Sequence, residues 1–324
     1  NKSLIFNYKI LFYSLSAIFY FFLSIYLVYA SIRLLQIKIN LQFIFLLFLG
    51  SGVAYYAFER YSMTHIYEVF TTCLLIFITL FPNIISIRDP TKTNSIAAFK
   101  SPNTTYWFGT DTLGRDIYSR VVYGTRTSIY IAYTSVLISL VIGCLLGLFS
   151  GYYGGYIDHI LGRLMDIIFS LPALLLAMVI SGIMGPSAKN AIISIGIVYI
   201  PHFFRLVRSE TMSLSKRPFV IGSKLIGLSD IKIMFHHILP NTWALIIVQA
   251  TVSLAYAILL EASLSFLGLG VQPPNPSLGS ILNDGRSFLQ LTPWMSFFPG
   301  FVIFIAVISI NLIGDNLRDL WDIK

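Results

Sequence analysis

The sequence predicts an all-α, polytopic integral membrane protein, built as a bundle of about eight membrane-spanning helices. Hydrophobic residues make up 56% of the 324 residues and charged residues only 11%, whereas soluble domains carry roughly 25% charged residues. Long apolar runs recur along the chain, and a helix of about 20 apolar residues crosses a bilayer. A polar, basic stretch at 205–241 separates two of these runs. A chain this apolar needs lipid as its solvent.

Eight apolar runs are candidate spans, and the second is the shortest. They cover about residues 10–30, 41–57, 69–87, 127–150, 164–184, 190–207, 243–267 and 295–314. The first run is followed by further spans rather than by the small-residue cleavage site of a signal peptide. Cys73 and Cys144 both fall inside apolar runs, so they predict neither a disulfide framework nor a metal site.

The basic residues predict the orientation of these spans. The net charge is +8, but Lys and Arg are scattered over loops, which indicates membrane topology and contact with anionic headgroups rather than nucleic-acid binding. The stretch 205–240 carries six basic and two acidic residues, which places it in the cytoplasm. Counting spans from there puts 88–126 and 268–294 outside and both termini inside. The 88–126 segment also holds six basic residues, so we expect part of it to be tucked into the protein.

The 205–241 stretch has the local signals of two short helices joined by a glycine turn. Pro218 suits a first helical turn, and Gly227 suits the left-handed position that ends a helix. Ser229 can cap a second helix, with Asp230 in its first turn. We expect that helix to stop by Leu239, because Pro240 disfavours a helical residue before it. An ordinary basic connecting loop is the equally weighted alternative.

Two further segments break the apolar pattern. The sequence WFGTDTLGRDIYSR at 107–120 sets Asp111 four residues before Arg115, and Asp116 four residues before Arg120. These pairs fit one face of a helix, so we expect an interfacial amphipathic helix that caps the bundle in preference to a ligand site. The sequence FLGLGVQPPNPSLGSILNDG at 266–285 is rich in Pro and Gly, which predicts a stiff external loop and a lid or docking surface.

Ionisable groups inside spans are candidates for a transport pathway, because burying them in lipid is costly. Glu261 lies in the 243–267 run, with Gln249 about three turns before it. The alternative for Glu261 is hydrogen bonding between helices, and the two interpretations stay open. For Asp166, Asn311 and Asp315 we favour hydrogen bonds between helices.

The 205–241 stretch resembles the cytoplasmic signature of bacterial ABC-importer permeases: E-A-A, three residues, G, nine residues, I, one residue, L-P. Gly227, Leu239 and Pro240 stand at the matching positions, and His237 takes the place of the isoleucine. The E-A-A triplet is replaced by Ile221, Gly222 and Ser223. The loss of the glutamate puts one polar contact in doubt, which Lys224 or Asp230 would have to supply.

The flanking motifs narrow the resemblance to the C-type permease subunit of the dipeptide/oligopeptide/nickel importer family. They are FGTDTLGRD, SGYYGG with RLMDIIFSLP, LVRSETMSLSKRPFV, HHILPN, ASLSFLGLGVQPP and NLIGDNLRDL, in order over about residues 105–324. The resemblance implies a permease domain at 69–324 with a six-helix type I importer core. Residues 1–68 would hold about two additional spans, peripheral to the pore.

The same resemblance implies a multi-subunit machine in a bacterial cytoplasmic membrane. Its partners would be a homologous B-type permease, two ABC ATPase subunits or domains and an external solute-binding protein. ATP and Mg²⁺ would belong to the ATPase subunits, and this chain would have no cofactor and no catalytic site of its own. Consistently, no Gly-Lys pair occurs in the sequence, so the phosphate-binding motif G-x-x-x-x-G-K-[ST] is absent.

Two other function classes have less support. A secondary transporter would need inverted repeats and broken helices at the membrane midplane, and we find no internal symmetry. An intramembrane enzyme would need a motif such as H-E-x-x-H or G-x-S-x-G, and neither is present. The substrate stays open, because the resembling permeases serve dipeptides and oligopeptides and, in relatives, nickel, heme or antimicrobial peptides.

Overall fold

The computed structural model describes residue 71 and residues 74–320. Residues 74–320 lie within one compact unit at 72–324. The candidate spans at 10–30 and 41–57, and the expected division at 1–68, lie outside the described residues. The third run, 69–87, is described only in part. Its residues 74–80 are helical, and α4 (Pro82–Ile85) follows them.

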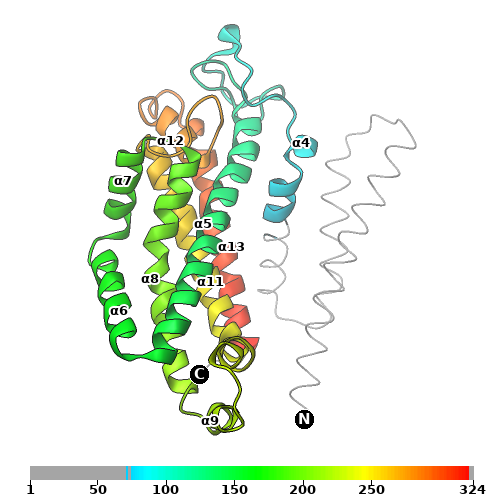
Figure 1. Ribbon diagram of the computed structural model, residues 1–324. Helices are drawn as coiled ribbons and strands as arrows, with labels where there is room; N and C mark the ends of the chain where they lie inside the picture. Colours follow the sequence, from blue (N-terminus) through cyan, green and yellow to red (C-terminus); the bar gives the residue numbers. More distant parts are fainter. Residues whose placement is uncertain (1–70, 72–73, 321–324) are drawn as a thin grey trace, which may run out of the picture. The chain divides into compact units, whose positions relative to one another are not determined.

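Within the described part of the chain, four helices are long and apolar enough to cross a membrane. They are α5 (Ile117–Tyr153), α8 (Ala188–Leu214), the helix over Asp230–Phe266 that ends in α11 (Leu239–Phe266), and α13 (Trp294–Leu320). These helices contain or closely match the predicted runs at 127–150, 190–207, 243–267 and 295–314. They lie side by side along the bundle (Figure 1).

The candidate span at 164–184 is not one continuous helix. The structure has α6 (Gly155–Phe169) and α7 (Ala173–Met184), which meet at an angle of 90°. Pro172 caps α7 with extended backbone (φ −54°, ψ 132°), and a proline disfavours helical geometry in the residue before it. We call this bent pair the broken span, and it lies along the side of α8 (Figure 1).

Short helices occupy the two ends of the bundle. At one end lie η1 (Ser95–Ala97) and α12 (Leu278–Arg286), and at the other lie α9 (Pro218–Leu225), α10 (Asp230–Ile233) and η2 (Met234–Ile238) (Figure 1). We call these the α12 end and the α9 end. The segments before α5 and around α12 thus share one end, as the span count predicts.

Glycines set the closest helix contact, between α5 and α8. Gly143, Gly147 and Gly151 are spaced by four on α5, and a Cβ on each would lie 2.6–2.7 Å from a carbonyl oxygen of α8. Ser139, one turn before Gly143, donates a 2.6 Å hydrogen bond from its hydroxyl to the Gly196 carbonyl of α8. Small residues at this spacing let membrane helices approach closely. The predicted spans did not include this packing signal.

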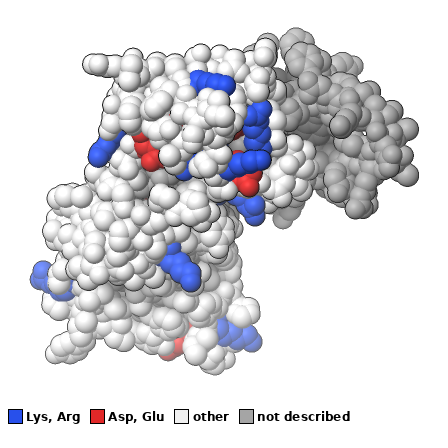
Figure 2. Space-filling model, turned by 90° about the horizontal axis from the view of Figure 1, so that it is seen from above, with Lys and Arg blue, Asp and Glu red and all other residues white. Residues whose placement is uncertain are grey.

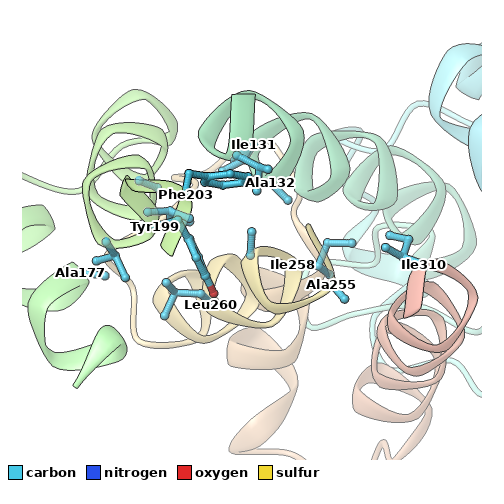
Figure 3. Close-up of a cluster of buried hydrophobic side chains, with 14 of the residues drawn as sticks. Ile131, Ala132, Ala177, Tyr199, Phe203, Ala255, Ile258, Leu260 and Ile310 are labelled. Carbon is cyan, nitrogen blue, oxygen red and sulfur yellow. The ribbon is translucent and has the colours of Figure 1, made fainter. Parts of the chain in front are cut away.

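The apolar core lies where five helices converge. Figure 3 shows Ile131 and Ala132 of α5 close to Phe203 and Tyr199 of α8, with residues of α7, α11 and α13 around them. Charged side chains are sparse on the surface seen from above, where they form isolated patches on a largely uncharged surface (Figure 2). The core around these helices is therefore apolar, and few charges lie on the face that Figure 2 shows.

Candidate functional site

The segment between α8 and α11 is the site that the sequence motifs single out. We call residues 215–238 the coupling segment. Pro218 is the first residue of α9, as predicted, and Gly227 has φ +82°, the left-handed conformation predicted for it. The Gly227 amide donates to the Lys224 carbonyl and the Leu228 amide to the Ser223 carbonyl. These two bonds end α9 in a Schellman motif.

The start of the second helix is where the prediction places it, but its cap differs. Ser229 occupies the N-cap position of α10, yet its side chain makes no capping hydrogen bond. Asp230 lies in the first turn, where a carboxylate is favoured by the helix dipole. Its Oδ1 accepts a 2.6 Å hydrogen bond from the Tyr152 hydroxyl of α5.

The prediction that this second helix stops by Leu239 is wrong. α10, η2 and α11 follow one another without a break. The Met234–Ile238 stretch is a π-helix, and the first residues of α11 include Pro240. A proline lacks an N–H and its ring clashes with the carbonyl four residues back, and the wider π-turn relieves that clash. The Asn241 side-chain amide also donates to the His237 carbonyl at 2.5 Å.

The expected coupling residues differ in exposure. Ile221 is exposed, Gly222 is partly buried, and Ser223 is buried, with its hydroxyl donating to the Phe219 carbonyl. His237 and Leu239 are partly buried, and Pro240 is exposed.

A group of bulky apolar side chains projects from the α9 end. Leu225 is 83% exposed and Ile226 is 78% exposed, directly before Gly227. The whole group, which we call the docking surface, consists of Phe219, Ile221, Leu225, Ile226 and Ile231. Apolar side chains gathered on one surface mark an interaction site.

Ion pairs link the helices near the same end. Arg208 of α8 forms a bidentate ion pair with Asp158 of α6. Its Nε donates to Oδ1 and its Nη2 donates to Oδ2, the latter at 2.6 Å. The Ser150 hydroxyl of α5 donates to the same carboxylate at 2.6 Å. Asp166 of α6 pairs with Arg205 of α8 at 2.7 Å, and both side chains are exposed. Asp158 and Arg208 were not predicted to pair, because residues 50 apart in sequence carry no spacing signal.

The α12 end holds a second charged cluster. Its structure shows that the helix predicted at 107–120 is wrong. Residues 107–116 form turns and α5 begins only at Ile117. Asp111 pairs with Arg115 at 2.6 Å, but in a loop rather than along a helix. Asp116 does not pair with Arg120. It caps α5 by accepting from the Ser119 amide at 2.9 Å.

Arg120 instead joins the loop to α12. It lies 3.4 Å from Asp111 and 3.0 Å from Asp284 of α12, and Arg115 lies 3.3 Å from the same Asp284. Both arginines are buried. Their burial accounts for two of the basic residues that run against the positive-inside rule in this segment.

Glu261 is fully buried between α5, α11 and α12. Its Oε1 accepts a 2.7 Å hydrogen bond from Ser265, and the hydroxyls of Ser128 and Ser277 lie near the same carboxylate. Oε2 has no partner of good hydrogen-bond geometry among the described residues. Gln249 is partly buried and donates to Ser253 on its own helix at 3.1 Å.

The hydrogen bonds between helices expected for Asn311 and Asp315 are not present in the described part of the chain. Asn311 is partly buried and Asp315 is exposed. Both lie in the last three turns of α13. Among the described residues, no group of three or more His, Cys, Asp or Glu side chains is placed to hold a metal ion.

Comparison with known proteins identifies the family. Residues 143–323 match the model of the "Binding-protein-dependent transport system inner membrane component" family. The dipeptide transport system permease protein DppC of Alkalihalophilus pseudofirmus is 46% identical over 77% of this chain and 82% of that protein. The glutathione transport system permease protein GsiD of Salmonella typhimurium is 45% identical over 69% of this chain and 74% of its own length.

A solved structure supports the same fold. The inward-facing MetNI methionine ABC transporter matches 62% of this chain and 96% of its own chain, with a TM-score of 0.51 and 18% identity. That likeness concerns the arrangement of helices alone. Taken with the sequence matches and the apolar helices, it leads to one conclusion. This chain belongs to the binding-protein-dependent transport system inner membrane component family and is a multi-pass permease subunit of an ABC importer, of the C type.

Proposed function

We propose that this chain forms half of the translocation pathway for dipeptides or oligopeptides in a bacterial cytoplasmic membrane. Its partners are a homologous B-type permease, two ABC ATPase subunits that bind ATP and Mg²⁺, and an external solute-binding protein. In this proposal both termini face the cytoplasm, and so does the α9 end. The chain itself carries out no chemistry and couples its movement to ATP hydrolysis on the ATPase subunits.

The docking surface is the observation that carries this proposal. Its apolar side chains project from two short helices around Gly227, at one end of the bundle. Apolar surface of this kind is stabilised when a partner covers it, at about 25 cal/mol for each Å² removed from water. The positive φ of Gly227 makes the turn sharp, which lets Leu225 and Ile226 stand out from the bundle.

Gly227→Glu tests the docking role. A Cβ at this position has nothing within 4 Å, so the folded chain accommodates it at roughly 1 kcal/mol for the positive φ. A carboxylate pressed into a protein cleft adds a desolvation penalty of several kcal/mol, and this penalty falls on the docked state alone. We expect the variant to insert and to pair with its partner permease, but to lose ATPase co-purification and ATP-driven uptake.

Leu225→Asp is a second test of the docking role, independent of Gly227→Glu, and it has a matched control. It places a charge on the 83%-exposed side chain of the docking surface, whereas Ile96→Asp does so at the 91%-exposed side chain of the α12 end. We expect only Leu225→Asp to lose the ATPase subunits. Normal ATPase co-purification and uptake by both Gly227→Glu and Leu225→Asp would overturn the proposal.

Peptides are the substrate class that the relatives' names favour. DppC proteins are named for dipeptide transport and GsiD proteins for glutathione transport, and glutathione is itself a tripeptide. Uptake of labelled alanyl-alanine and of labelled glutathione into proteoliposomes, with the cognate binding protein and ATP, separates the two. Competition by Ni²⁺ or heme without competition by any peptide would exclude the peptide assignment.

A further inference from the structure

One side chain connects the coupling segment to the transmembrane bundle. Tyr152, in the last turn of α5, donates its hydroxyl to Asp230 of α10 at 2.6 Å. The ammonium of Lys224, in α9, lies 4.4 Å from the centre of the same ring. Lys224 and Asp230 stand on opposite sides of the Gly227 turn. Tyr152 therefore contacts both short helices of the coupling segment at once.

Tyr152 lies two residues before a glycine corner that has open space around it. Gly154 and Gly155, which join α5 to α6, have φ of +63° and +55°, and a Cβ on either would meet nothing within 4 Å. Glycine adopts positive φ without a steric cost, so two such residues in open space permit the corner to change its angle. What fixes the corner must come from side chains on either side of it.

On the far side of the corner, α6 is tied to the rest of the bundle. Asp158 in its first turn accepts hydrogen bonds from Ser150 of α5 and Arg208 of α8. α6 then leads into the 90° break before α7. An unbroken series of contacts thus runs from the coupling segment through Tyr152 and the glycine corner to the broken span.

We propose that Tyr152 is the positioning residue through which displacement of the coupling segment moves the α5–α6 corner. This inference rests on the proposed function, since it needs an ATPase to displace the segment. The phenol is suited to the role because its hydroxyl and its ring face bind two differently charged groups independently. Loss of the hydroxyl frees α10 from α5 and leaves the docking surface intact.

Tyr152→Phe is the test, because it removes one oxygen and keeps the ring that Lys224 contacts. The complex should still co-purify with its ATPase subunits. The uptake of peptide per ATP hydrolysed should fall about twofold to tenfold, the effect of losing one hydrogen bond of ordinary strength. The measurement compares peptide uptake and ATP hydrolysis in the same proteoliposomes, using the peptide that the wild-type complex transports.

Tyr153→Phe is the matched control. Tyr153 adjoins Tyr152 and its ring packs edge-on against it, but its hydroxyl makes no hydrogen bond to any residue that the structure describes. We expect its uptake per ATP to equal that of the wild type. An equal loss in Tyr153→Phe would show that the effect belongs to this helix end in general, and would overturn the assignment.

A double-mutant cycle with Asp230→Ala separates transmission from simple destabilisation. If the two side chains act through their mutual bond, the double variant should lose no more coupling than Asp230→Ala alone. Additive losses, or an unchanged ratio in Tyr152→Phe, would refute the inference while leaving the docking proposal untouched. Loss of the ATPase subunits from Tyr152→Phe would make it a docking residue instead, and would equally refute it.

Discussion

Asp111 is the residue on which the α12 end depends most directly. Its carboxylate pairs with Arg115 and Arg120 and accepts hydrogen bonds from the backbone amides of Leu113 and Arg115. Both arginines also reach Asp284, which is partly exposed. Removing one partner from a buried pair leaves an uncompensated charge, which is far costlier than the pair is favourable. The cluster therefore acts as a clamp between the loop before α5 and α12.

Asp111→Ala should destabilise the chain by about 3–5 kcal/mol, the cost of stranding buried charge. The measurement is thermal unfolding of the purified complex in detergent. Asp89→Ala is the control, because Asp89 is exposed and its carboxylate accepts hydrogen bonds from the nearby Thr91 in the same loop. It should change the unfolding temperature little. Equal shifts in the two variants would show that the clamp contributes nothing to stability.

At the scale of helices, the contact between α5 and α8 is governed by three glycines. Gly143, Gly147 and Gly151 face carbonyl oxygens of Ile200, Phe204 and Arg208. Backbone atoms cannot move aside as a flexible side chain does, so any larger residue forces the helices apart. In a membrane, where no hydrophobic driving force joins helices, such close packing supplies much of the attraction.

Gly147→Ala should therefore lower the stability of the chain, although alanine is the better helix former. A Cβ there would lie 2.6 Å from the Phe204 carbonyl oxygen. Gly162→Ala on α6 is the matched control, since its Cβ would have nothing within 4 Å. That change should be neutral or stabilise by roughly 0.5–1 kcal/mol. The measurement is the thermal unfolding temperature of both variants. A higher unfolding temperature for Gly147→Ala would contradict the packing argument.

At the scale of the molecule, apolar surface remains uncovered along the broken span. Ile160 and Ile167 of α6 and Ile183 of α7 are largely exposed. In the transporter that we propose, a second permease and lipid would together cover this surface. The charged clusters, by contrast, are confined to the ends, so the two ends and the side of the bundle serve different contacts.

We expect the intact transporter to contain one copy of this chain and one copy of a different, homologous permease. Co-expressing two differently tagged copies of this chain with the other subunits should yield active complexes that each hold one tag. The mass of the purified complex gives an independent measure of its stoichiometry. Recovery of both tags in one transport-active complex would show a homodimeric pore instead.

The sequence alone determined the class of the protein, the positions of four spans and the turn at Gly227. These follow from local rules: apolar length, the fixed φ of proline and the freedom of glycine at positive φ. The family motifs were likewise readable, because they are short runs of neighbouring residues. Local rules gave the wrong prediction at Pro240, because the π-turn of residues 234–238 lets the helix continue. They also failed at 107–120, where Arg120 pairs with Asp284 rather than with Asp116.

Only the tertiary structure decided which distant groups meet. Asp158 with Arg208, Tyr152 with Asp230, and the arginines with Asp284 join residues separated by 50 to 169 positions. No spacing along one helix encodes such contacts, because they depend on how whole helices are placed. The way α6 and α7 both pack against α8 is likewise visible only in the tertiary structure. The spans thus follow from the hydrophobicity of each segment, which favours its transfer into lipid. The contacts between spans follow from the three-dimensional arrangement of the bundle.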